Sequence, residues 1–132
     1  MRTPPALHPF AALVGFRIEE QRAGFSRLTL EVSERHLNPH AVAHGAVLYA
    51  LADTGMGAAL YPTLAEGEIC ATLDVTISYF KPVAAGPLEC TTELVNRGRS
   101  TANLESRLFA GSVLVARASG TYSIFTPRGR PR

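Results

Sequence analysis

The sequence predicts an α+β fold in which an antiparallel sheet wraps around one long apolar helix. Residues 45–61 carry a single charged side chain, Asp53, among residues that are apolar on every side of a helix. Segments before and after this stretch alternate apolar and polar residues with the period of two that is typical of half-buried strands. The 132 residues suit a single domain spanning residues 1–132.

The elements before the long helix are predicted to be a short helix and a pair of strands. A proline at the start and Gly15 at the end predict the helix over residues 9–14. Residues 16–21 and 25–33 then alternate as strands and predict a hairpin that turns at "RAG".

The long helix is predicted over residues 45–61, because Pro62 cannot continue it. Gly55 and Gly57 each weaken this helix by about 1 kcal/mol relative to alanine. Their presence suggests close packing against another backbone. A single six-stranded sheet cannot cover a helix that is apolar on all sides, so we expect the protein to form a dimer.

The rest of the chain predicts four strands joined by short connections. They are, in order, ATLDVTISYF, PLECTTELV, TANLESRLF and VLVARASGTYSIF. Short connections predict an antiparallel meander in which consecutive strands are neighbours. In the first of these strands the alternation opposes two sets of side chains: Leu73, Val75, Ile77 and Tyr79 against Thr72, Asp74, Thr76 and Ser78.

The charge distribution argues against a nucleic-acid binder. Three of the thirteen Lys and Arg residues lie in the last six residues, and the other ten nearly balance eleven acidic residues. A nucleic-acid-binding domain would carry a basic face on its folded part. Cys70 and Cys90 form no CxxC pair and fall in strand-like segments, which predicts buried, reduced thiols.

No membrane or export segment is apparent in the sequence. No apolar stretch reaches the ~18 residues that a membrane span needs, and the N-terminus has no apolar run of signal-peptide length. We therefore expect a cytoplasmic, soluble protein with no nucleic-acid or membrane partner. We also expect flexible ends at residues 1–8 and 127–132.

Asp53 is the first candidate for a catalytic group. Burying a carboxylate costs several kcal/mol unless it is compensated, so an acid in an apolar helix needs a reason. Gly45, at the start of the same helix, offers a backbone N–H at the positive end of the helix dipole, where it can polarise a carbonyl oxygen. Two structural explanations stay open: a buried Asp53 paired with an arginine or with backbone donors, and a tight turn at Gly45.

Three histidines precede the helix at intervals of four residues: His36, His40 and His44. Pro39 argues against a continuous helix there, and no Cys, Asp or Glu accompanies them within that segment. We therefore expect no metal site. His36 and His40 are interpreted as loop residues, whereas His44 adjoins Gly45 and is a candidate site residue.

The spacing of His44 and Asp53 predicts a site shared between subunits. Nine residues separate them, so on one helix they point to opposite sides, about 13 Å apart along the axis. They cannot meet on one reacting atom within a single chain. If both act in one site, that site combines the helix start of one subunit with the helix middle of another.

Two long segments resemble a known enzyme family. "HLNPHAVAHGAVLYALADTGMGAAL" and "ATLDVTISYFKPVAAGPLECTTELVNRGRSTANLESRLF" are similar to the hotdog-fold thioesterases of the phenylacetic-acid-degradation (PaaI-like) type. The likeness covers residues 9–125 by order of elements and is strongest from Asn38 to Pro82. Its most specific features are N-x5-HG, an Asp nine residues after the His, and a strand ending in "YFKP".

The resemblance implies a function and a set of site residues. It implies hydrolysis of an acyl-CoA thioester, with no metal or other cofactor, by a homotetramer built from dimers. Asn38 and His44 would hold the thioester, and the Gly45 N–H would polarise its carbonyl. Asp53 of the neighbouring subunit would act as general base or nucleophile, and Thr72 matches a hydroxyl position that assists the water.

One residue departs from the family pattern, which usually reads HGG where this chain reads "HGA". Ala46 keeps a backbone N–H, so the donor at Gly45 survives, while the added methyl group bears on the choice of acyl group.

Because coenzyme A carries phosphates, basic residues should flank the cleft. The candidates are Lys81, Arg97 and Arg99.

Three other functions stay open from the sequence. An enoyl-CoA hydratase or dehydratase of the same fold is one, although Asp53 in mid-helix fits it less well. A non-catalytic acyl-CoA binding or sensing protein is the second, and a structural dimer with Asp53 in an ion pair is the third. The acyl group also stays open among arylacetyl, aryl and medium-chain fatty acyl groups.

Overall fold

The structure, a computed structural model, describes residues 8–128. The helices are α1 (Pro9–Val14), η1 (Glu34–His36, 3-10), α2 (Gly45–Leu60) and η2 (Tyr61–Thr63, 3-10). The strands are β1 (Phe16–Arg22), β2 (Phe25–Val32), β3 (Ile69–Tyr79), β4 (Gly86–Arg97), β5 (Thr101–Ala110) and β6 (Val113–Phe125). The predicted flexible ends lie mostly outside the described residues; within them, His8 caps α1 by accepting a hydrogen bond from the Ala11 N–H.

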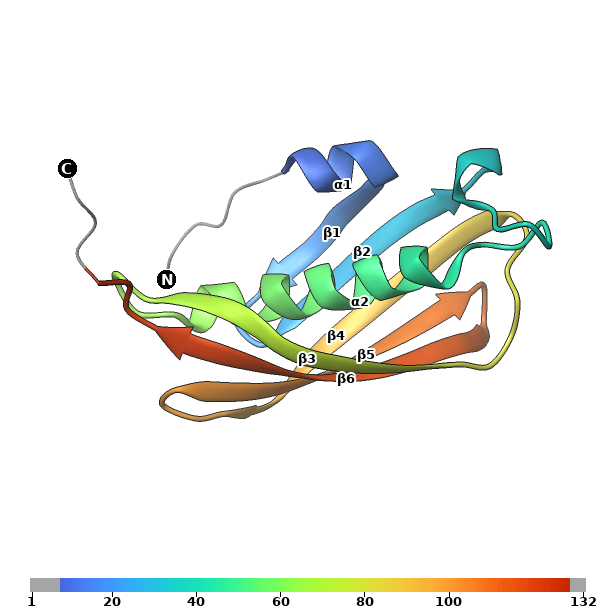
Figure 1. Cartoon of the computed structure of the whole chain (residues 1–132). Helices are drawn as coiled ribbons and strands as arrows, with labels where there is room; N and C mark the ends of the chain where they lie inside the picture. Colours follow the sequence, from blue (N-terminus) through green and yellow to red (C-terminus); the bar gives the residue numbers. More distant parts are fainter. Residues whose placement is uncertain (1–7, 129–132) are drawn as a thin grey trace.

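One six-stranded antiparallel sheet curves around α2, as the sequence predicts (Figure 1). The strand order is β1-β2-β4-β5-β6-β3. The predicted four-strand meander is wrong for β3, which pairs with β6 and not with β4. One side of β4 is taken by β2, from Phe25↔Glu93 to Val32↔Gly86, and the other side by β5. Both sides of β4 are thus occupied, and β3 pairs along the free side of β6, which leaves β1 and β3 as the two edges of the sheet.

Helix α2 is buried on the side that faces the sheet but not all round. Leu51, Met56 and Leu60 are fully buried in the core. A stripe at helical spacing is exposed or half-buried on the opposite side: Ala46, Tyr49, Asp53 and Gly57. In the isolated chain the sheet thus covers only part of the circumference of α2, as expected for a helix that a single sheet cannot cover.

Close packing at the helix glycines occurs at Gly55, but against side chains of the sheet and not against another backbone as predicted. A Cβ atom added there would lie 2.7 Å from Thr92 Oγ1, far inside a normal contact. Ser26 Oγ on β2 also donates a 2.7 Å hydrogen bond to the Gly55 carbonyl oxygen. At Gly57 an added Cβ would find its nearest neighbour, Tyr122, at 3.9 Å, so close packing is absent there within the described residues.

Neither cysteine forms a disulfide bond within the described residues. Cys90 lies in the core, and burial raises the pKa of its thiol to about 12. Cys70 is only half-buried. Among the described residues, no helix combines the length and apolar character needed to cross a membrane.

Candidate active site around Asp53

The carboxyl group of Asp53 is held by two hydroxyl groups from the sheet. Thr72 Oγ1 on β3 donates a 2.8 Å hydrogen bond to Asp53 Oδ1. The Tyr122 hydroxyl on β6 donates to the same oxygen and lies 2.6 Å from the backbone carbonyl oxygen of Asp53. Two adjacent strands therefore anchor the one acidic side chain of α2 from the same side.

A β-bulge in β3 puts Thr72 in this position. Thr72 pairs with Tyr122, but the next regular pair is Asp74 with Thr121, so Leu73 is the extra residue. Before the bulge, Thr72 is the residue that faces the helix. After the bulge, Val75 and Ile77 face it and pack against the core. The strict alternation predicted for this strand, which put Leu73 on the same face as Val75 and Ile77, is wrong at Leu73. This residue is 58% exposed. The bulge lets one strand present a polar group to Asp53 and apolar groups to the core.

Tyr122 is a site residue that the sequence analysis missed. It is only 4% exposed, and burial, together with the hydrogen bond to Asp53, raises the pKa of its hydroxyl. It therefore stays protonated and acts as a donor at physiological pH. Its link to Asp53 depends on the pairing of β6 with β3, which sequence alternation alone does not reveal.

No ion pair within the described residues of this chain includes Asp53. Among residues 8–128 the ion pairs join Arg17 and Arg22 to neighbouring glutamates, Arg27 to Glu20 and Arg97 to Glu68, and none includes Asp53. Its partners are two neutral hydroxyl groups. Within these described residues the carboxylate charge is stabilised by donors and left without a countercharge.

The start of α2 forms a second cluster. His44 is the N-cap, and its Nδ1 accepts a 2.9 Å hydrogen bond from the Ala46 N–H. Gly45 is the first helical residue, so its N–H has no acceptor within the helix. The Tyr79 hydroxyl donates a 2.6 Å hydrogen bond to the Gly45 carbonyl oxygen, and an added Cβ at Gly45 would lie 3.0 Å from the Tyr79 ring.

This contact explains the glycine better than a tight turn does. Gly45 is absent from the described residues with positive φ, so its backbone conformation is open to any residue. A side chain at this position would instead press on Tyr79.

A hollow of about 410 Å³ lies beside the helix start and gathers several predicted site residues. It is lined by Asn38, Gly45 and Lys81, with apolar walls that include Tyr79 and Leu48. Asn38 Oδ1 accepts hydrogen bonds from the backbone N–H groups of His40 and Val42, at 2.8 and 3.4 Å, and so shapes the loop before the helix.

Five of the predicted residues fall into two groups. Asn38, Gly45 and Lys81 line the hollow, whereas Asp53 and Thr72 contact each other farther along α2. His44 lines a different hollow, of about 370 Å³, together with Phe10 and Val47.

His36 is structural. It is buried in η1 and is not the loop residue that the sequence suggested. Its Nδ1 accepts a 2.9 Å hydrogen bond from the Ser33 N–H, so its Nε2 carries the proton and donates to the Val14 carbonyl oxygen at 2.6 Å. His40 is exposed. No group of three or more His, Cys, Asp or Glu side chains that could hold a metal occurs in the described part of the chain.

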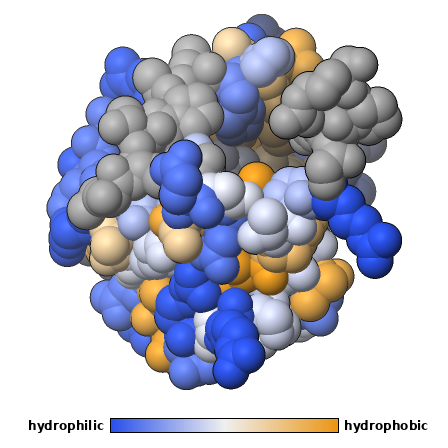
Figure 2. Space-filling view, turned by 90° about the vertical axis from the view of Figure 1, so that its left-hand side faces the viewer, coloured by the Kyte–Doolittle hydropathy of each residue, from blue (hydrophilic) through white to orange (hydrophobic). Residues whose placement is uncertain are grey.

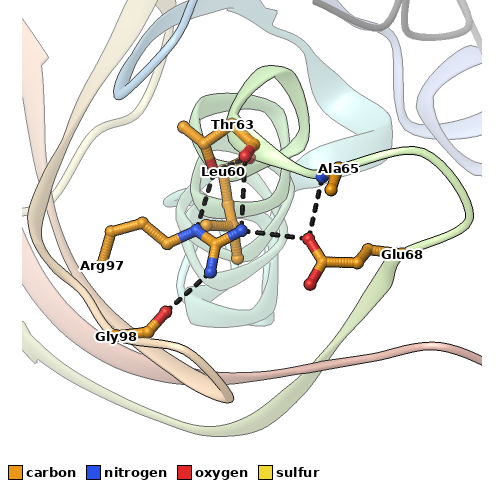
Figure 3. A network of polar contacts seen from close by, with 6 residues as sticks. All are labelled: Leu60, Thr63, Ala65, Glu68, Arg97 and Gly98. Carbon is orange, nitrogen blue, oxygen red and sulfur yellow. Dashed lines mark hydrogen bonds and ion pairs between the residues drawn. The ribbon is translucent and has the colours of Figure 1, made fainter.

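Arg97 is engaged in a network at the C-terminal end of α2 (Figure 3). Its guanidinium donates to the Thr63 hydroxyl and carbonyl oxygens, both at 3.3 Å, to the Gly98 carbonyl oxygen at 2.6 Å and to Glu68 at 3.1 Å. A hydrogen bond from the Ala65 N–H, with help from Arg97, lowers the pKa of Glu68. These contacts give Arg97 a structural role and do not favour its expected role as a phosphate ligand.

The other two basic candidates are exposed. Lys81 borders the hollow at the helix start, and Arg99 lies in the turn between β4 and β5.

Figure 2 shows the molecule from the left-hand side of Figure 1: hydrophilic side chains dominate this face, with apolar ones between them.

Comparison with known proteins decides the family. The model of the thioesterase superfamily matches residues 40–116, which is more than half of the chain. The matched range includes His44, Gly45, Asp53 and Thr72, whereas Asn38 and Tyr122 lie outside it. The chain belongs to the thioesterase superfamily. It is a hotdog-fold thioesterase of the PaaI-like type, and the reaction that it catalyses is thioester hydrolysis.

Individual relatives agree with this assignment. The acyl-coenzyme A thioesterase PaaI of Escherichia coli is 32% identical over 92 residues, 69% of this chain and 64% of that protein. A protein of Archaeoglobus fulgidus is 31% identical over 111 residues, 83% of this chain and 70% of its own length. A mutant of the phenylacetic acid degradation protein PaaI from Thermus thermophilus superposes with a TM-score of 0.82 at 31% identity, covering 88% of this chain and 98% of that one.

Proposed function

We propose that this thioesterase hydrolyses an acyl- or aryl-CoA thioester, with Asp53 as general base or nucleophile. The observation that carries the proposal is the state of the Asp53 carboxyl group. Two neutral hydroxyls hold Oδ1, and among the described residues Oδ2 has no partner. A positioned carboxylate with a free oxygen and no countercharge is suited to take a proton from water or to attack a carbonyl carbon.

The start of α2 supports the other half of the mechanism. As a thioester carbonyl is attacked, negative charge develops on its oxygen, and the Gly45 N–H at the positive end of α2 is suited to stabilise it. Asn38 and His44, which both precede this donor in the sequence, would hold the thioester. Collapse of the intermediate breaks the C–S bond, and the leaving thiolate takes up a proton.

We propose that the two halves come from different subunits of a dimer. Gly45 and Asp53 are eight residues apart on one helix, about 12 Å along its axis, and Asp53 is not among the residues that line the hollow at Gly45. The isolated chain also leaves apolar surface at the unpaired edge of the sheet: Leu73 is 58% exposed, and Tyr79 and Phe80 are each 49% exposed. A homotetramer of such dimers remains part of the proposal.

Subunit complementation tests the shared site. Asp53→Asn removes the carboxylate, and His44→Asn removes the imidazole but keeps a side chain that can cap α2. We expect each variant to be impaired and a co-refolded mixture to regain about a quarter of wild-type activity, because half of the dimers are mixed and each mixed dimer holds one complete site. Mixed dimers that are verified by mass but show no recovery would place the whole site in one subunit.

The relative from Escherichia coli supports coenzyme A as the carrier, because its name describes an acyl-coenzyme A thioesterase. Lys81 at the hollow and Arg99 in its turn are the exposed basic groups proposed to meet the phosphates. The geometry of the site does not bear on the pathway or the cellular compartment. A role in phenylacetic acid degradation and a cytoplasmic location are therefore hypotheses.

Thiol release from a panel of acyl-CoA esters tests the proposed function. Arylacetyl, aryl and medium-chain acyl-CoA should release free CoA and acid, ranked by kcat/KM. Loss of enoyl-CoA absorbance without thiol release would favour the hydratase alternative. Saturable acyl-CoA binding with no thiol release from any ester would favour a sensor.

A further inference from the structure

We infer that Tyr122 is a positioning residue for Asp53 and that Asp53 Oδ2 is the oxygen that reacts. This inference rests on the proposed function of Asp53. It adds a residue outside the candidate set taken from the sequence, and it assigns different tasks to the two carboxylate oxygens.

The geometry separates the two oxygens. The hydroxyls of Thr72 and Tyr122 both donate to Oδ1, from neighbouring strands whose register pairs these two residues directly. The terminal torsion of an aspartate side chain is soft, so a carboxylate without such donors can exchange its two oxygens. Two donors on one oxygen oppose this rotation and keep Oδ2 directed away from the sheet.

Tyr122 is better suited to this task than an exposed hydroxyl. Its side chain is buried, and its hydroxyl also contacts the backbone carbonyl oxygen of Asp53 at 2.6 Å. One tyrosine therefore ties the acid to the sheet through both main chain and side chain. The ionisable groups that act on this hydroxyl are Asp53 and the Cys70 thiol, and no Lys, Arg or His of the described residues forms an ion pair with Asp53.

Kinetics of Tyr122→Phe test the inference against a purely structural role. We expect kcat to fall about 10- to 100-fold with KM little changed, because a donor to a charged group that takes part in the chemistry is lost. Thr72→Val should act in the same direction, whereas Thr72→Ser, which keeps the hydroxyl, should retain most of the activity. Ser26→Ala is the matched control, because Ser26 also ties the sheet to a carbonyl oxygen of α2, that of Gly55.

A purely structural Tyr122 would make Tyr122→Phe resemble Ser26→Ala, with a lower Tm and unchanged kcat. That result, with Asp53→Asn inactive, overturns the inference and leaves the proposed function intact. An active Asp53→Asn enzyme would instead overturn the proposed function itself.

Discussion

Replacing Asp53 with Asn should lower kcat by about 10³-fold or more and leave the protein folded. The amide is nearly isosteric with the carboxyl group, and its oxygen can still accept hydrogen bonds from Thr72 and Tyr122. It cannot take a proton from water or attack a carbonyl carbon. Initial rates of thiol release, measured beside Tm and the oligomer mass, check both halves of this expectation.

Asp74→Asn is the matched control for this experiment. Asp74 lies on the same strand as Thr72 but beyond the bulge, with an exposed side chain near Asn103 and Thr121 on the outer face of the sheet. We expect full hydrolysis from this variant. Hydrolysis by Asp53→Asn at the wild-type rate would show that the carboxylate at the centre of α2 is not the catalytic group.

Much of the fold follows from patterns within single elements. The bounds of α1, the first hairpin and α2 agree with the predicted ones to within about a residue at each end, because Pro9, Gly15 and Pro62 mark limits that local chemistry sets. The position of β3 could not be predicted in the same way. It depends on which strand edges remain free once β2 has paired with β4, and that is a property of the whole sheet.

The candidate site was predictable in part for the same reason. Asp53 is conspicuous because a charge in an apolar helix is costly, and the contact with Thr72 agrees with the position that the family resemblance gave it. Tyr122 gave no such signal, since an aromatic residue in a strand is ordinary core material until register places it beside an acid. Arg97 looked like any surface base, and only the chain path brings Thr63 and Glu68 to it.

Gly55→Ala should destabilise the protein by about 1–3 kcal/mol, although alanine favours a helix by ~1 kcal/mol. The added methyl would lie 2.7 Å from Thr92 Oγ1 in a fully buried layer. Thr92 cannot simply turn away, because its hydroxyl shares a 2.7 Å hydrogen bond with that of Ser106. Either the helix lifts from the sheet or this buried hydrogen bond breaks. Denaturant unfolding at a fixed protein concentration measures the change.

Gly57→Ala should have the opposite sign and serves as the matched control. At this position the nearest atom to an added Cβ is 3.9 Å away, an ordinary contact, so alanine brings its helix propensity without a clash. We expect a gain of about 0.5–1 kcal/mol. Equal effects of the two substitutions would contradict a clash specific to Gly55. Because Gly57 lies on the open stripe of α2, a loss of stability at this position alone would instead mean that a partner subunit packs closely against that stripe.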